Sequence, residues 1–268
     1  MKTIIAGVDF TQSSYNAARY AAMLARKAKS KLTLFNMFEV PLIHSNSGLY
    51  FMSYSALRDG SAARLKKFRQ RIQDEFPSLK IDFFVTAGPF RDELDQFIKK
   101  HRVEYIVLGM TTKNRFSKFL YGSHTTDIAG RLTAPVIIVP EQYKVHKSGK
   151  VVLCVDNREK LHAASLKPLE NLLLENRSAL QVLHVRTEEE LFDSAGKREV
   201  KVGGQRYPVQ VVAASDLQKG VKKYGLAQKP QLIVIISHKH SAFYKLFNET
   251  NTKNIAFSSR VPVMAIHE

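Results

Sequence analysis

Four apolar segments from the first half of the sequence recur in the same order in the second half. The offset between the copies is 147 residues at the first pair, 148 at the second and 127 at the last two. The second copy therefore lacks about twenty residues between Val185 and Val209. Such self-similarity predicts two copies of one structural unit. The matching pairs are 4–9 with 151–156, 32–37 with 180–185, 105–109 with 232–236, and 134–139 with 261–266.

Within each copy, apolar strands alternate with amphipathic helices. In the first copy we expect strands at 4–8, 32–37, 81–85, 105–108 and 136–139, with a long helix near 54–75 between the second and third. Continuous apolar strands separated by helices indicate a parallel sheet that is covered on both faces. The sequence thus predicts an α/β protein with two doubly wound, five-stranded domains, at 1–144 and 150–268, joined by a polar linker.

The chain is strongly basic, with a net charge of +17 that is not confined to one segment. A basic surface on ordinary domains explains this better than a nucleic-acid-binding tail, so nucleic acid is not an expected partner, although affinity for anions stays open. The basic segment 64–71 fits a helix whose charges face water and which buries Leu65, Phe68 and Ile72.

Cys154 lies in an apolar run and is expected to be a buried thiol. The sequence shows no signal peptide and no membrane span, so we expect a cytoplasmic location.

The segment after strand 105–108 has the composition of a phosphate-binding loop. It starts at Gly109 and reaches Gly122 and Ser123 immediately before a helical pattern. In a parallel sheet of this kind, ligands bind beyond the carboxyl ends of the strands. Glycine leaves backbone N–H groups accessible, and a helix N-terminus attracts anions. Side chains that can add hydrogen bonds or positive charge are Lys113, Arg115, Lys118, Ser123 and Thr125. A glycine that only forms a turn is the alternative interpretation.

These residues resemble a known family. The spacing Gly109-x2-Thr112-x9-Gly122-Ser123 is similar to the nucleotide motif G-x2-G-x9-G-[S/T] of universal stress proteins. Asp9 at the end of the first strand, Phe35-Asn-Met37 in place of the family's Leu-His-Val, Gly88-Pro89 and the ending at 134–140 agree with it. Because both copies share the pattern, the chain resembles a tandem universal stress protein. This resemblance implies Rossmann-like, adenine nucleotide alpha hydrolase-like domains.

The resemblance also implies a binding function. ATP, accompanied by Mg²⁺, would be held in the N-terminal domain, and the protein would act by binding and signalling in a stress response. Any ATP hydrolysis would be slow and incidental. Asp9 and Met37 would hold the adenine and ribose side. The residues expected around the ribose and phosphates are Gly109, Thr112, Arg115, Gly122, Ser123, His124 and Thr125.

Two departures from the family pattern matter. Thr112 stands at the family's second glycine, and affinity for triphosphate falls if that position needs a positive φ. In the second copy, Ile236 and Glu249 replace the glycines that correspond to Gly109 and Gly122. A carboxylate at that place would repel phosphate oxygens, so the second copy is not expected to bind ATP. His238 and His240 have no further metal-ligating residue nearby and are interpreted as a solvated turn, not as a metal site.

Three other functions remain open at this point: an interaction protein that binds no nucleotide, an adenylate-handling enzyme, and an RNA-binding protein. No nucleophile and base pair was found that would support catalysis. We expect the halves to pack as a pseudo-dimer through the terminal strands 136–139 and 263–266, since both are apolar edge candidates, and we expect self-association through these strands.

Overall fold

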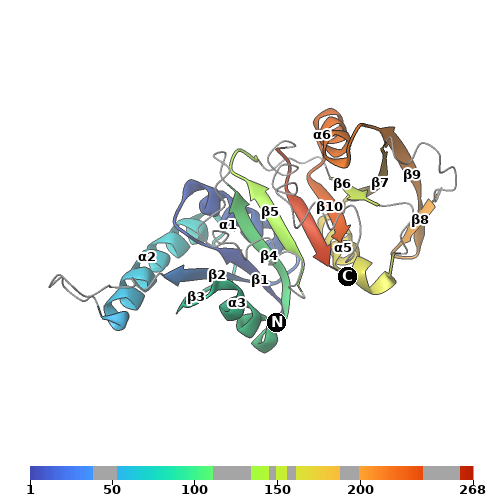
Figure 1. Cartoon of the computed structure of the whole chain (residues 1–268). Helices are drawn as coiled ribbons and strands as arrows, with labels where there is room; N and C mark the ends of the chain where they lie inside the picture. The colour runs from blue at the N-terminus through green and yellow to red at the C-terminus, as the bar shows by residue number, and fades with distance from the viewer. Residues whose placement is uncertain are drawn as a thin grey trace.

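The computed structural model describes residues 1–38, 53–110, 134–144, 149–155, 161–187, 199–237 and 260–267. From β1 to β4, strands and helices alternate as the sequence predicts (Figure 1). The first half contains β1 (Thr3–Gly7), α1 (Gln12–Lys27), β2 (Lys31–Phe38), α2 (Tyr54–Glu75), β3 (Ile81–Ala87), α3 (Phe90–Lys100), β4 (Val103–Met110) and β5 (Val136–Pro140). The second half contains β6 (Lys150–Cys154), α5 (Ala163–Asn176), β7 (Ala179–Arg186), β8 (Glu199–Val202), β9 (Gln205–Ala213), α6 (Leu217–Gln228), β10 (Leu232–Ser237) and β11 (Val263–His267).

The strands within the described ranges form one 11-stranded sheet with the order β3-β2-β1-β4-β5-β11-β10-β6-β7-β9-β8. Each half supplies five parallel strands, which confirms the predicted doubly wound α/β class. The two sets meet where β5 pairs antiparallel with β11, with Ile137 opposite Met264 (Figure 1). The predicted contact between the terminal strands is therefore confirmed within one chain. Because the two sets run in opposite directions, their carboxyl ends lie at opposite edges of the sheet.

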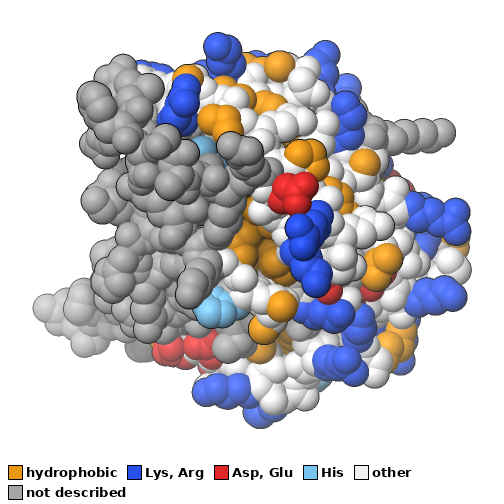
Figure 2. Space-filling view, turned by 90° about the vertical axis from the view of Figure 1, so that its right-hand side faces the viewer, with side chains coloured by type: hydrophobic (Ala, Val, Ile, Leu, Met, Phe, Trp, Pro, Cys, Tyr) orange, Lys and Arg blue, Asp and Glu red, His pale blue; other side chains and the backbone are white. Residues whose placement is uncertain are grey.

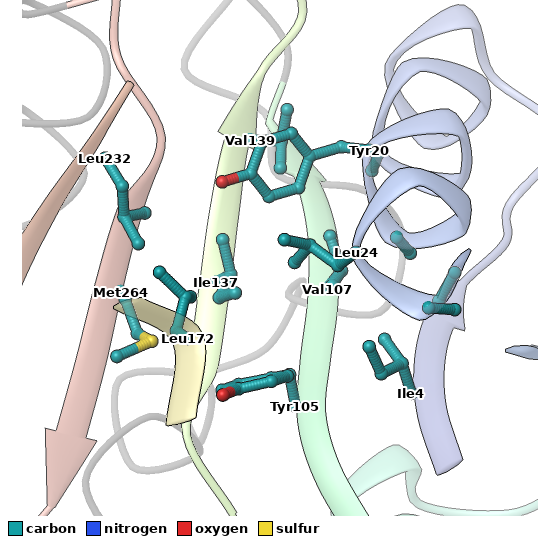
Figure 3. Packing of buried hydrophobic residues seen from close by; sticks show 14 of the residues in the cluster. Ile4, Tyr20, Leu24, Tyr105, Val107, Ile137, Val139, Leu172, Leu232 and Met264 are labelled. Atoms are coloured by element: carbon teal, nitrogen blue, oxygen red, sulfur yellow. The ribbon is translucent and has the colours of Figure 1, made fainter. Parts of the chain in front are cut away.

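Two layers of helices cover the sheet, and each layer buries a core that continues from one half into the other. The cluster beneath α1, α2 and α5 joins residues of the first half, such as Ile137, to Leu172 and Met264 of the second. Figure 3 shows Leu172 between the strands of the two halves, with Tyr105 pointing toward it. The cluster beneath α3 and α6 contains Leu94 and, from the second half, the predicted core thiol Cys154. Burial raises the pKa of Cys154 to about 12, so this thiol is unreactive.

Hydrogen bonds also connect the first half of the chain to the second half. The Tyr105 hydroxyl on β4 donates a hydrogen bond of 2.9 Å to the carbonyl of Pro168 in α5. The Tyr143 hydroxyl donates to the carbonyl of Gln231, at 3.2 Å, just before β10. Both tyrosine side chains are buried, so these bonds satisfy hydroxyl groups that would otherwise be costly to bury.

Helix α2 confirms the interpretation of the basic segment 64–71. Only Leu65, Phe68 and Ile72 of this helix are buried. No residue before Leu65 in α2 is buried, so the first part of the helix extends past the core. On the face of the molecule that carries β8, β9 and α6, Lys and Arg side chains lie at several separate places, as Figure 2 shows. This distribution agrees with a dispersed basic surface on that face.

The second half differs from the first where twenty residues are missing. In the described part of this region, which begins again at residue 199, β8 pairs antiparallel with β9. The turn between them is formed by Gly203 and Gly204, which have φ angles of 58° and 85°. Val200 and Val202 of β8 are buried, and the Gly203 N–H donates 2.8 Å to the Glu170 carboxylate of α5. This short hairpin covers the core that α2 covers in the first half.

Candidate functional site

Three of the predicted site residues lie together at one edge of the sheet. β2, β1 and β4 are neighbours, so their carboxyl ends place Met37, Asp9 and Gly109 side by side. The chain proceeds from β1 toward β2 and β3, but from β4 toward β5 on the other side. The gap between β1 and β4 is thus the topological switch point of the first half. Open α/β sheets bind ligands at this point.

Asp9 forms a tight turn that starts helix α1. One carboxylate oxygen, Oδ1, accepts hydrogen bonds from the Thr11 N–H at 3.0 Å and from the Thr11 hydroxyl at 2.5 Å. Thr11 is the N-cap of α1, and its hydroxyl accepts from the Ser14 N–H at 3.2 Å. Side chains of this type cap helices because they bond the N–H groups of the first turn. Asp9 is therefore held in a fixed place at the entrance of the helix.

Phe10, between Asp9 and Thr11, has a left-handed backbone with a φ of 65°. This conformation is unusual for a residue with a Cβ and requires support from its surroundings. The support comes from α2: the Phe10 ring packs edge-on to Phe68 at 6.2 Å, and the Arg64 guanidinium lies 4.0 Å from its centre. Sequence reasoning did not single out Phe10 or Arg64, because neither the φ angle nor the packing leaves a local signal.

Gly109 is needed for the packing of helix α1 on β4. A Cβ at this position would lie 2.5 Å from the carbonyl oxygen of Ser13 and 2.6 Å from its Oγ. Ser13 belongs to the first turn of α1, so the absence of a side chain at Gly109 lets that turn lie directly on β4. The closeness of helix and strand brings the Asp9 turn next to the end of β4.

Asn36 links the ends of β2 and β1 at the same edge of the sheet. Its side chain is buried on β2, and the Nδ2 group donates a 2.7 Å hydrogen bond to the carbonyl of Val8. In the second half, the ring nitrogen Nδ1 of His184 makes the equivalent 3.1 Å contact with the carbonyl of Val155. The contact therefore recurs with the repeat, although one copy uses an amide and the other an imidazole. The sequence comparison counted the segment that contains Asn36 among those that agree with the family but gave Asn36 no role, and the repeat offset was the signal that pairs Asn36 with His184.

Met37 is half-buried at the end of β2 and pairs with Thr86 of β3. The Thr86 hydroxyl donates 2.5 Å to the Glu93 carboxylate at the start of α3. The backbone of Met37 is therefore fixed within the sheet, and its side chain offers an apolar surface. The other predicted site residues lie outside the described residues: Thr112, Arg115, Gly122, Ser123, His124 and Thr125.

The equivalent edge of the second half is built differently. Ile236 stands at the position of Gly109, and its side chain is buried. With the repeat offset of 147, the start of α1 at Gln12 corresponds to position 159. Helix α5 instead begins at Ala163, four residues later. A helix that begins one turn later leaves room for the isoleucine side chain. The second half thus lacks the close contact between first helix and strand that Gly109 permits in the first half.

Metal ligands are not gathered within the described ranges, which contain no group of three or more His, Cys, Asp or Glu side chains that could hold an ion. In the same part of the chain, no helix has both the length and the apolar composition to cross a membrane.

Comparison with known proteins agrees with the family resemblance and with the fold. The profile of the universal stress protein family matches residues 1–140, which is more than half of the chain. The chain therefore belongs to the universal stress protein family. A universal stress protein of Helicobacter pylori strain 26695 is 25% identical over 138 residues, which is 50% of this chain and 97% of the relative.

Solved structures extend the similarity of fold to both halves. The crystal structure of a universal stress protein from Archaeoglobus fulgidus has a TM-score of 0.67 at 14% identity, and the match covers 99% of this chain and 98% of that one. A functionally unknown protein, PA1789 of Pseudomonas aeruginosa, has a TM-score of 0.58 at 9% identity over 99% of this chain and 92% of its own. At these identities the comparison supports the fold alone.

Proposed function

We propose that this chain is a cytoplasmic stress-response protein that binds ATP at the switch point of its first half. The observation that carries the proposal is the convergence of Asp9, Met37 and Gly109 at the carboxyl ends of β1, β2 and β4. These are the described members of the residue set that the family resemblance assigns to the nucleotide.

The described residues suit the adenine and ribose side of the ligand. Met37 offers an apolar side chain and a fixed backbone, and adenine needs both an apolar contact and in-plane hydrogen bonds. The Asp9 carboxylate, fixed by Thr11, is an acceptor for ribose hydroxyl groups. In this proposal the phosphates, with Mg²⁺, lie against the segment from Gly109 to Thr125. Backbone N–H groups near Gly122 and Ser123 would bind phosphate oxygens there, and Arg115 would reduce their charge.

The proposed mechanism is binding and signalling, not catalysis. Asp9 Oδ1 and the Thr11 hydroxyl bonded to it are both engaged in holding the helix cap, so in this proposal the pair has a structural role and not that of a base and its nucleophile. Hydrolysis of bound ATP would be slow and incidental. The second half would serve as a partner that stabilises the first, because Ile236 occupies the place of Gly109 and the sequence has Glu249 where phosphate would lie.

Titration calorimetry with ATP and with ADP tests the proposal. The wild-type chain should bind one nucleotide saturably, and Gly122→Glu should abolish binding because it places a carboxylate against phosphate oxygens. Ser123→Glu and Thr250→Glu form a matched pair, since the offset of 127 relates the two positions. Ser123→Glu should abolish binding and Thr250→Glu should leave it unchanged. Equal loss in both variants would contradict a site in the first half.

The alternative function is an interaction protein that binds no nucleotide, and Thr112 favours it because it replaces a motif glycine. Absence of heat and of a thermal shift at millimolar ATP would support this alternative. Thr112→Gly then separates the two cases: if the threonine alone blocks the site, this variant should gain saturable ATP binding. If Thr112→Gly also fails to bind, the nucleotide proposal is wrong.

A further inference from the structure

Among the strands that the structure describes, β3 lies at the end of the sheet and has β2 as its single neighbour (Figure 1). The pairing covers the whole strand, from Ile81 opposite Leu32 to Ala87 opposite Phe38. The Leu32 N–H donates 3.0 Å to the carbonyl of Lys80. In a parallel pair, alternate residues direct both backbone groups to the same neighbour. Even-numbered residues of β3 thus bond to β2, and Ile81, Phe83, Val85 and Ala87 direct their N–H and C=O groups outward.

Five of the seven side chains of β3 are apolar, and all of these except Ile81 are at least partly exposed. Phe83 and Phe84 are 37% and 36% exposed, on opposite faces of the strand. Phe84 stacks on Phe35 at 5.3 Å and lies 5.1 Å from Phe97, so one side of its ring is packed and the other remains open. A row of unpaired backbone groups with apolar side chains on both faces is a template for another strand.

The opposite end of the sheet is protected. β8 has four residues, and it pairs antiparallel with β9. Its exposed positions are the charged Glu199 and Lys201, and Arg206 lies 3.5 Å from Glu199. Short length and charged side chains are the usual means by which an edge strand resists pairing. β3, with seven residues, is therefore the open end of the sheet.

We infer that β3 pairs antiparallel with β3 of a second copy of this chain, so that two sheets join across a two-fold axis at Phe84. In this register Phe83 lies opposite Val85 of the second copy, and Ile81 lies opposite Ala87. These are the residues whose backbone groups point outward, so each pair exchanges two hydrogen bonds. Phe84 lies opposite its own copy on the α3 face, where aromatic cross-strand pairs stabilise a sheet.

The position of the charged Asp82 favours the register centred on Phe84 over the registers centred on Asp82 or on Phe83. Asp82, which pairs with Lys31 at 2.9 Å, lies opposite Thr86, so no carboxylate of one β3 strand lies opposite a carboxylate of the other. Centring the axis on Asp82 would place two carboxylates opposite one another, which destabilises a strand pair. Centring it on Phe83 would place Asp82 against the Phe84 ring. The outward positions of β3 are apolar when read in either direction, and this self-complementarity favours a second copy over a foreign peptide.

The chain already joins its own halves in the same way, through antiparallel pairing of β5 with β11. Those strands have neighbours on both sides, so they have no free edge for another chain. β3 is therefore the strand through which two chains can associate. Helix α2, which packs on β3, has six Lys and Arg residues and three Asp and Glu residues. Two such helices repel one another across the axis, so added salt should strengthen the dimer.

Disulfide cross-linking tests the register. Residues opposite each other in a non-hydrogen-bonded antiparallel pair have Cα atoms about 4.5 Å apart, within the range for a disulfide. Phe84→Cys should thus form a covalent dimer under mild oxidation. Lys80→Cys is the control, because in this register its two copies lie about 27 Å apart. The native Cys154 is buried and should not react. Equal cross-linking of both variants, or none for Phe84→Cys, would overturn the proposed register.

Sedimentation of the unlinked protein tests the pairing itself. Val85→Pro removes an outward N–H and no bond to β2, and proline is tolerated on the free side of an edge strand. The wild-type chain should be a dimer, and Val85→Pro should raise its dissociation constant at least about tenfold, or 1.4 kcal/mol. Val85→Thr, which keeps the N–H and the branched side chain, should remain a dimer. Circular dichroism checks that Val85→Pro is folded. A monomeric wild type, or a folded Val85→Pro dimer as strong as wild type, would contradict the inference.

Discussion

At the scale of single residues, Gly109 shows why a motif position can have two roles. The motif assigns it to the nucleotide, but in the structure its missing side chain first serves the contact between β4 and the Ser13 turn of α1. Sequence spacing identified the residue and not this role, because the contact joins segments that are almost one hundred residues apart. The same holds for Asn36 and Phe10, whose roles depend on strands and helices from elsewhere in the chain.

Replacement of Gly109 by alanine should therefore destabilise the fold before any ligand is considered. The new methyl group would lie 2.5 Å from a backbone oxygen, and overpacking of this kind costs about 1–3 kcal/mol. Gly60→Ala is the control: the position is in α2 with nothing within 4 Å, so alanine should stabilise the protein by about 0.5–1 kcal/mol. Urea denaturation measures both free energies of unfolding. An unchanged stability for Gly109→Ala would show that α1 does not rest on β4 as described.

At the scale of helices and strands, the apolar pattern was sufficient to predict the parallel strands and the helices between them. It did not locate β8 and β9 in the second half. None of the side chains of β9 is fully buried and the strand contains Pro208, so it lacks the continuous apolar run that marks the parallel strands of the core. Its place in the sheet depends on pairing with β7 and on the burial of Val200 and Val202 against α5, which a local pattern does not encode.

The contact of α5 with the first half gives a prediction about pH. Glu175 of α5 lies 3.7 Å from Lys2, which also pairs with Glu104 of β4. Burial, and then the charge of Glu104, raise the pKa of Glu175 above its ordinary value of 4.5. A carboxyl whose pKa is raised by folding contributes stability below its unfolded pKa and loses it as pH rises through the folded pKa.

Glu175→Gln should remove this loss, because the amide resembles the protonated acid at every pH. Below pH 4.5 the variant and the wild type should have similar free energies of unfolding. As pH rises above that value, the variant should become the more stable of the two. Urea denaturation over a series of pH values measures the difference. A difference that stays constant, or that favours the wild type with rising pH, would show that the pair with Lys2 outweighs burial.

At the scale of the whole molecule, the repeat predicted two units and the structure joins them into one sheet. The two halves are connected by packing as well as by the linker, since both hydrophobic clusters contain residues of the two halves. The sequence predicted which strands would meet, because both are apolar, but it did not predict that cores on both faces would become continuous. Continuity of this kind depends on the facing directions of paired residues, such as Ile137 and Met264 on one face.

We therefore expect the chain to unfold as one cooperative unit. Shared cores make the loss of one half costly for the other, which is the condition for two-state behaviour. Scanning calorimetry should show a single transition whose calorimetric and van't Hoff enthalpies agree, and circular dichroism and tyrosine fluorescence should give coincident curves. Two separate transitions would instead indicate that 1–144 and 150–268 are independently stable domains.

The central claim is that adenine nucleotide binds in the first half of this chain and not in the second. The most direct measurement is a crystal structure of the protein purified from cells without added nucleotide and then of crystals grown with ATP. The account predicts density for an adenine nucleotide beside Asp9, Met37 and Gly109, and none at the edge that carries Val185 and Ile236. Density at both edges, at the second alone, or at neither in the presence of saturating ATP would contradict it.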